Sequence, residues 1–442
     1  MDYELDVAFS DLEVAPPPEQ PRANVAAGEP RRVNNLTLID GKTFLATTLA
    51  GDIVPPGSTD VGLFFQDTRF LSHWELRVNQ HRAVVLSAAN QKNTLAQIEL
   101  TTTNLLVRDN LDLPENTVHI HREQLLAGQF FDRITFHNFN LQPVELDVEL
   151  HCNCDFMDVF QVRGMLRGAA GTHFEPAVRP PWLIFSYLGR DEIFRQTRIH
   201  FHPAPLEIQP HLVRYQLRLR PGEKQVLGMA VRPHAAPRPA ATSEARAAAP
   251  RSNGDSFEPC LARRRQNYAK WARATTIFES SDDLFDRCLQ TAMSDFFSLR
   301  VPFETTPGPP SDHVEELEAE EPCGGTPPGS GEIIAAGIPW FATIFGRDSL
   351  IAGYQSLILH PRLARETLRF LARWRGRRED DWREEQPGKI PHEFREGEMT
   401  RDGEMPHSPY YGSLDSTPLF LILLSETFNW TGDRALLEEL WP

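Results

Sequence analysis

Apolar and polar residues alternate along much of the chain between Asn35 and residue 234. Every second residue from Val144 to Cys152 is apolar, with charged or histidine side chains between them, and the pattern returns from Val213 to Leu219. This period of two is typical of strands with one buried and one solvated face. No helical pattern separates these strands. We therefore predict antiparallel sheets packed as a β-sandwich over residues 34–234.

The pattern becomes helical after a segment of Ala, Pro, Arg and Ser at 235–256, which we interpret as a linker. Residues 257–277 are predicted as a connecting helix. Over 278–442, helical stripes and loops alternate, as in the first part of a six-hairpin α/α toroid. Pro418 to Asn429 has hardly a polar face, which predicts a helix buried on all sides. The fold expected is multidomain, a β-sandwich followed by an incomplete toroid.

Two segments lack any periodicity. Residues 1–33 include Ala15 to Pro21, where four of the seven residues are prolines, and they are predicted to form a mobile tail. Residues 305–332 contain an acidic run from Glu315 to Glu321 and are predicted to be a disordered surface insertion. No function is assigned to either segment.

Composition narrows the choice of partners and compartment. The net charge of −16 argues against nucleic acid, which basic proteins attract. No stretch approaches the ~20 apolar residues of a membrane span, and no basic start precedes an apolar run. Five scattered cysteines make no disulfide framework and no zinc motif, so a reducing cytoplasm fits best. Metal and cofactor are expected to be absent, and the oligomeric state is left open.

The most informative stretch runs from Gly337 to Leu359. A stripe of five residues predicts a helix buried on one face, namely Leu350, Ile351, Tyr354, Leu357 and Ile358. Arg347 and Asp348 fall in its first turn, after Trp340 and Phe341. A guanidinium fork, a carboxylate and a flat apolar wall suit a sugar ring with vicinal hydroxyls. An ion pair capping a core helix explains the same residues, and both interpretations stay open at this point.

A second group of charged residues lies in the β-region and mixes with aromatics. It comprises Asp67, Arg69, Asp155, Asp158 and Arg163. One interpretation places the group at a sugar groove or interdomain face, and the other has it holding loops and strand ends. We favour the second, because polar networks more often fix loop geometry than bind ligands.

The chain resembles the bacterial amylo-α-1,6-glucosidase or glycogen-debranching-like family from about Val33 to Pro442. The resemblance is carried by runs that appear in the expected order. They are Gly41-Lys-Thr-Phe-Leu45, Asp67-Thr-Arg-Phe-Leu71, Asp155-Phe-Met-Asp-Val-Phe160, Pro339-Trp-Phe341, Gly346-Arg-Asp-Ser349, Gly388-Lys-Ile-Pro-His-Glu393 and Tyr410-Tyr-Gly-Ser-Leu-Asp415. More distantly, Arg347-Asp348 is similar to the Arg-Asp pair with which glucoamylases hold the terminal glucose.

The resemblance implies an inverting hydrolysis of α-glucosidic linkages in glycogen-like or oligosaccharide substrates, with one general acid and one general base. The substrate-binding residues it implies are Trp340, Phe341, Arg347, Asp348, His392, Glu393, Arg395, Tyr411 and Asp415. No catalytic residue is assigned within the chain, because the family's general acid and general base are expected beyond Pro442. We therefore expect a truncated glycosidase that is inactive alone. The alternative is a non-catalytic carbohydrate-binding protein or a structural remnant.

Overall fold

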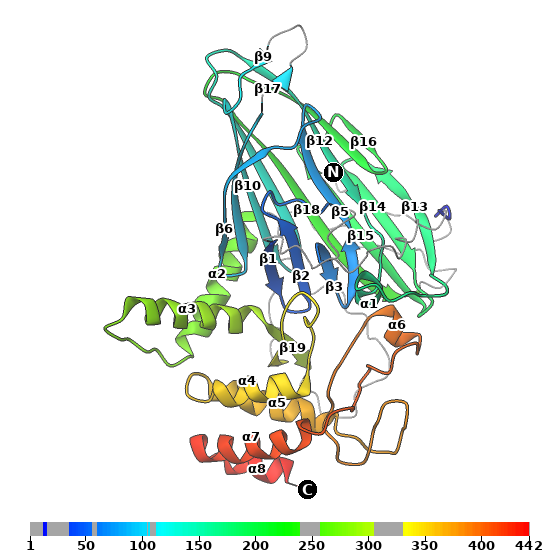
Figure 1. Ribbon diagram of the computed structural model, residues 1–442, viewed down its shortest axis with the longest axis vertical. Coiled ribbons are helices and arrows are strands. Elements are labelled where there is room, and N and C mark those ends of the chain that lie inside the picture. The colour runs from blue at the N-terminus through cyan, green and yellow to red at the C-terminus, as the bar shows by residue number, and fades with distance from the viewer. Residues whose placement is uncertain are drawn as a thin grey trace. The chain divides into compact units, whose positions relative to one another are not determined.

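The computed structural model describes residues 12–15, 35–54, 60–103, 105–106, 112–238, 257–304 and 330–441. These residues form two compact units (Figure 1). The first contains the described residues of 12–38 and 45–261, and the second those of 39–44, 262–304 and 330–441. No helix in these ranges is long and apolar enough to cross a membrane.

The first unit is built on antiparallel sheets. The largest has the strand order β13-β14-β15-β18-β11-β10-β7-β6. Its strands are β6 (Val84–Gln91), β7 (Leu95–Thr101), β10 (Val118–Ala127), β11 (Gln129–Asn138), β13 (Thr172–Arg179), β14 (Trp182–Leu188), β15 (Ile193–His202) and β18 (Lys224–Pro237). A second sheet has the order β16-β17-β12-β5, with β5 (His73–Val78), β12 (Val144–Asn153), β16 (Glu207–Gln209) and β17 (Leu212–Leu219).

Shorter strands complete the described β-structure. A four-stranded sheet contains β1 (Asn35–Asp40), β2 (Thr43–Thr48), β3 (Gly62–Phe65) and β4 (Thr68–Leu71). Two-stranded ladders join β8 (Leu105–Leu106) to β9 (Asp112–Leu113) and β19 (Arg300–Glu304) to β20 (Ser330–Ile334). The predicted wet face of β12 is confirmed, because its apolar residues are buried while Glu145, Asp147 and Asn153 are exposed.

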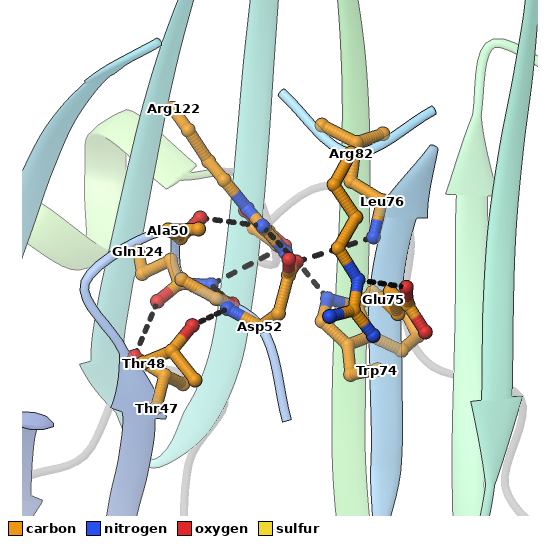
Figure 2. A network of polar contacts seen from close by, with 12 residues as sticks. Thr47, Thr48, Ala50, Asp52, Trp74, Glu75, Leu76, Arg82, Arg122 and Gln124 are labelled. Atoms are coloured by element: carbon orange, nitrogen blue, oxygen red, sulfur yellow. Dashed lines mark hydrogen bonds and ion pairs between the residues drawn. The ribbon is translucent and has the colours of Figure 1, made fainter. Parts of the chain in front are cut away.

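The two larger sheets face each other across a core that includes a polar centre. Trp74 of β5 packs edge-on against Phe130 of β11, and its indole nitrogen donates to the Asp132 carboxylate at 2.7 Å. Arg122 of β10 has no exposed side-chain surface and bonds to both Asp132 and Asp52. Figure 2 shows how the labelled Arg122 reaches Asp52 and the Ala50 carbonyl. Antiparallel sheets packed in this way confirm the predicted sandwich.

The charged group predicted to hold loops does so. Arg69 of β4 forms a bidentate ion pair with Asp155, and Asp158 accepts a hydrogen bond from the Phe160 amide. Asp158 is thereby the N-cap of the short helix α1 (Val159–Val162). These contacts tie strand β4 to the chain after β12 within the same unit.

The other described helices follow β18 in the sequence. They are α2 (Phe257–Arg273), α3 (Asp283–Ser298), α4 (Gly346–Gln355), α5 (Pro361–Arg373), α6 (Glu398–Arg401), α7 (Ser416–Thr431) and α8 (Arg434–Leu440). Leu350, Leu368 and Leu423 come from α4, α5 and α7 and share one buried core. The left-handed Gly432 ends α7, and Asp433 caps α8. The predicted fold class, a sandwich followed by a helical region, is confirmed.

Two predictions of burial are wrong. Helix α7 is not enclosed on all sides, because Leu421 and Ile422 are 61% and 51% exposed. The stripe of α4 is only half buried, since Leu350 is covered whereas Ile351 and Tyr354 are exposed. Both errors have the same cause. The hydrophobic pattern shows that a side chain is apolar, but it does not show whether a neighbouring helix covers that side chain.

Some predicted boundaries also shift. Val14, inside the predicted tail, bridges to Phe174 at the edge of β13. Strand β18 runs to Pro237, past the predicted start of the linker, and β20 begins at Ser330, inside the predicted insertion. The rest of the tail, the linker and the insertion lies outside the described residues. The described cysteines are not all in the same state. Cys260 is disulfide-bonded, whereas Cys152, Cys154 and Cys288 are free.

Candidate active site

Three segments of the second unit run alongside one another at the start of α4. Phe345 bridges to Glu393, and Glu393 bridges in turn to Tyr410. The amide of Gly346 donates to the His392 carbonyl at 2.8 Å, and the amide of His392 donates to the Tyr410 carbonyl at 2.7 Å. The motifs around positions 340, 390 and 410, which are far apart in the sequence, are thus joined by backbone hydrogen bonds.

Glycine at position 346 permits this close approach. A Cβ at that position would lie 2.0 Å from the Pro391 carbonyl oxygen, so any side chain would push the two segments apart. Gly346 is also the first residue of α4, and Arg347 and Asp348 follow it directly. The glycine therefore fixes where the Arg-Asp pair stands relative to the segment at 391–393.

Arg347, Asp348 and Asp415 form one charged cluster. The Arg347 guanidinium lies 3.1 Å from the Asp415 carboxylate and 3.9 Å from that of Asp348. Asp415 is the N-cap residue of α7, so the cluster joins the first turns of α4 and α7. The side chains are 46%, 43% and 42% exposed, which leaves hydrogen-bonding atoms open to a ligand.

Ser413 orients Asp415. The Ser413 hydroxyl donates to one Asp415 oxygen, while Arg347 donates to the other. The hydrogen bond from Ser413 does most to lower the pKa of Asp415. Burial acts to raise this pKa, and Arg347 lowers it further. Asp415 is therefore held as an anion, ready to accept hydrogen bonds from hydroxyl groups.

Three predicted site residues are buried and engaged within the protein. The Arg395 guanidinium donates to Glu393 at 2.7 Å and to the Trp340 carbonyl at 2.8 Å. The Tyr411 hydroxyl donates to the Trp374 carbonyl at 2.8 Å, and burial raises the pKa of Tyr411 to about 12. In this structure these side chains hold the site loops together and present little surface to a ligand.

Aromatic side chains surround the junction of the loops. Phe341 is 46% exposed and packs edge-on against Phe345, which packs in the same way against His392. Trp340 and His392 are half-buried. The Nδ1 atom of His392 is buried without a hydrogen-bond partner among the described residues. The loop therefore offers apolar surface beside a polar atom that has no protein partner there.

An apolar groove of about 120 Å³ runs along the same two helices. It is lined by Leu350, Ile351, Tyr354, Leu419, Ile422 and Leu423. Because α4 and α7 carry Arg347 and Asp415 in their first turns, the charged cluster and the groove lie on the same pair of helices. Leu414, beside Asp415, is 94% exposed.

Neither Ser413 nor the hydrogen bond from the Tyr410 hydroxyl to the Glu384 carboxylate, at 2.7 Å, was predicted from the sequence. Ser413 gave a weak signal, since a serine just before a helix start commonly caps it. Glu384 gave none, because its contact spans 26 residues of loop. The described residues contain no group of three or more ligand-type side chains able to hold a metal ion.

Residues 38–230 match the family model described as the N-terminal domain of (some) glycogen debranching enzymes. This part of the chain is similar to that domain family. The match covers most of the β-sandwich, which is less than half of the chain. No curated protein matches the chain.

Solved structures extend the likeness beyond the glycogen-debranching-type domain. The "Putative kojibiose phosphorylase from human microbiome" is 10% identical with a TM-score of 0.57, and the match covers 91% of this chain and 54% of that one. A bacterial glucoamylase complexed with acarbose is 10% identical with a TM-score of 0.48, covering 98% and 60%. At such identities the likeness concerns the fold. The chain spans little more than half the length of the first of these structures.

Proposed function

We propose that this chain recognises the terminal glucose unit of α-glucosidic oligosaccharides or glycogen-like substrates, as part of an inverting glycoside hydrolase of the amylo-α-1,6-glucosidase type. The observation that carries the proposal is the half-exposed cluster of Arg347, Asp348 and Asp415 at the N-terminal ends of α4 and α7. The glycogen-debranching-type domain supports the substrate class.

The chemistry of the cluster suits a sugar. A guanidinium donates to two neighbouring hydroxyl groups at once, and carboxylates accept from them. Asp348 and Asp415 stand on either side of the same guanidinium, so a ring with vicinal hydroxyls finds donor and acceptors in one place. The apolar groove and Phe341 supply surface for C–H groups.

The same geometry argues that these carboxylates bind and do not transfer protons to the glycosidic oxygen. A general acid of a glycosidase needs a raised pKa, whereas the pKa of Asp415 is lowered. Glu393 is buried and paired with Arg395. In the proposal these groups orient the sugar, and Glu393, Arg395 and Tyr411 position the loops that carry the other contacts.

A binding role without catalysis is the second candidate. It is favoured by Asp415, because the hydrogen bonds from Ser413 and Arg347 lower the pKa of this carboxyl group and a general acid needs a raised one. Sugar release separates the two candidates. Both share the same sugar site, so binding is tested first.

The direct test is calorimetric titration of the full chain with maltotriose, with an α-1,6-branched dextrin and with cellotriose as the control sugar. We expect binding of the α-glucans and weaker binding after Arg347→Lys, which keeps the charge but loses the fork. Arg434→Lys is the matched control, because Arg434 is 83% exposed on α8. Equal binding of all three sugars, or no effect of Arg347→Lys, rejects the proposal. Glucose release is then assayed on the same samples.

A further inference from the structure

A tight turn at residues 380–385 belongs to the second unit and lies in the loop that follows α5. Asp380 and Glu385 exchange two backbone hydrogen bonds, at 3.1 and 3.0 Å, and so close the turn. The Asp380 carboxylate accepts from the amides of Trp382 and Arg383, at 3.1 and 3.3 Å. A side chain that bonds to the backbone two and three residues ahead holds a turn in one conformation. The backbone under Trp382 is therefore fixed.

The turn is joined to the segment just before α7. The amide of Tyr411 donates to the Arg383 carbonyl at 2.9 Å, and the Tyr410 hydroxyl donates to the Glu384 carboxylate at 2.7 Å. A Cβ at Gly412 would lie 2.1 Å from the Tyr410 hydroxyl oxygen, so this hydroxyl lies directly over the backbone at position 412. Glu384 thus lies close to Gly412. The turn therefore borders the segment that leads into the charged cluster of the candidate sugar site.

Trp382 stands at the tip of the turn and is 58% exposed. Its indole ring has no aromatic or cationic partner in the described ranges. An exposed indole presents a flat apolar face, which suits the C–H face of a pyranose ring. Because the backbone of the turn is already fixed, little conformational freedom is lost when a ligand packs against it.

Glu384 adds a polar group two residues away from this indole. Its backbone is left-handed, with a φ of 50°, a conformation that is costly for a residue with a side chain and recurs where ligands are held. One carboxylate oxygen accepts from Tyr410, and the hydrogen bond to Glu384 raises the pKa of Tyr410, so the phenol keeps its proton. The other oxygen has no hydrogen bond within the described part of the chain, and the residue is exposed. That oxygen is open to a sugar hydroxyl.

We propose that the turn at 380–385 binds a glucose unit beyond the terminal one, with the Trp382 indole packed on its ring and the open Glu384 oxygen accepting from one of its hydroxyls. The inference rests on the proposed function, because it extends the same site along an α-linked glucan. A second sugar position of this kind creates a preference for chain length. A single glucose unit reaches only the charged cluster, whereas a longer oligosaccharide also reaches the turn.

The test is calorimetric titration of the full chain with methyl α-glucoside, which has one glucose unit, and with maltotriose. The unaltered chain should bind maltotriose about tenfold more tightly. Trp382→Ala should weaken maltotriose binding about tenfold and leave methyl α-glucoside binding unchanged, whereas Trp382→Phe should keep most of the preference. Trp430→Ala is the matched control and should change neither affinity. Trp430 is 54% exposed and lies at the C-terminal end of α7, away from Asp415.

Two results would overturn the second sugar position. One is equal affinity of the unaltered chain for the two sugars. The other is an equal loss of both affinities in Trp382→Ala, because it would show that the turn only supports the site loops. If Trp382→Ala does not fold, Glu384→Gln decides the matter, since it should weaken the binding of maltotriose alone.

The same titrations separate this inference from the proposed function. If methyl α-glucoside binds and Arg347→Lys weakens that binding, the terminal-glucose site stands, and the results at Trp382 bear only on the second position. If neither sugar binds, the proposed function is rejected and the second position with it.

Discussion

The Arg347 guanidinium lies 3.1 Å from the Asp415 carboxylate although 68 residues separate them in the chain. Each residue stands at the start of a helix, and the two helices share the core of the second unit. Helix packing therefore brings the two charges together. An ion pair exposed to this degree contributes little to stability, and we propose that it serves to bind a ligand.

Replacing Asp415 by asparagine should weaken the binding of α-glucans while leaving the fold intact. The substitution keeps the shape but removes the charge that accepts hydrogen bonds from hydroxyl groups. Losing one charged hydrogen bond costs about 1.5–3 kcal/mol, which corresponds to a dissociation constant at least tenfold higher. Calorimetry on Asp415→Asn and Asp348→Asn measures this. Wild-type affinity together with a lower melting temperature would instead favour a purely structural ion pair.

The sequence predicts the architecture well where the pattern is local. Alternation over β12 and β17 identifies strands with one wet face, and the Gly432-Asp433 pair marks the junction of α7 and α8. It fails where burial depends on a neighbour that the pattern does not contain. Leu421 and Ile422 are as apolar as core residues and are nonetheless exposed. Hydrophobicity specifies what a side chain prefers and not what covers it.

Burial of the candidate site residues also depends on neighbours that the sequence pattern does not contain. Motif positions brought Arg347, Asp348 and Asp415 into one candidate set, and the structure joins them. The sequence did not distinguish Arg395 and Tyr411, which are buried, from the exposed members of the set.

Removing the charge of Asp132 should destabilise the β-unit strongly. Arg122 has no exposed surface, and Asp132 receives three of its hydrogen bonds as well as one from Trp74. Taking one partner from a buried ion pair costs about 3–5 kcal/mol, because the other charge stays buried with less compensation. Chemical denaturation of Asp132→Asn measures the loss. Glu145→Gln, at an exposed position of β12, is the control and should change stability by less than about 1 kcal/mol.

Acid should destabilise the unaltered chain more than a Glu75→Gln variant. Burial acts to raise the pKa of Glu75, but hydrogen bonds from Arg82, Arg77 and His73 outweigh it and lower the pKa from 4.5 to about 2. A carboxylate with a lowered folded-state pKa contributes stability above its unfolded value and loses it as the pH falls toward the folded value.

The advantage of glutamate at position 75 should therefore be complete above about pH 4.5 and vanish near pH 2. Unfolding free energies of both proteins at several pH values in that range provide the measurement. Parallel pH curves for the two proteins would show that Glu75 is not the group responsible.

Introducing a methyl group at Gly346 should disrupt the candidate site. The new Cβ would lie 2.0 Å from the Pro391 carbonyl oxygen, so the segment at 391–393 must move away from α4. Overpacking of this kind costs about 1–3 kcal/mol, and α-glucan binding should be lost with it. Gly168→Ala is the control, because nothing lies within 4 Å of a Cβ there. Unchanged melting and binding in Gly346→Ala would mean that the backbone contact is not required.

Limited proteolysis of the full chain should leave the β-sandwich as the more resistant part and degrade the helical unit first. Proteases cut where a segment opens locally, and opening is easiest where few apolar contacts hold an element. Ile351 and Tyr354 of α4 and Leu421 and Ile422 of α7 are exposed beside an open groove, so the apolar surface that would resist opening is only partly buried. Each 100 Å² left uncovered forgoes about 2.5 kcal/mol of burial. Mass spectrometry of the fragments should find residues 60–238 persisting after residues 346–441 have been cleaved. Survival of the helical fragment instead would show that this face is covered in solution.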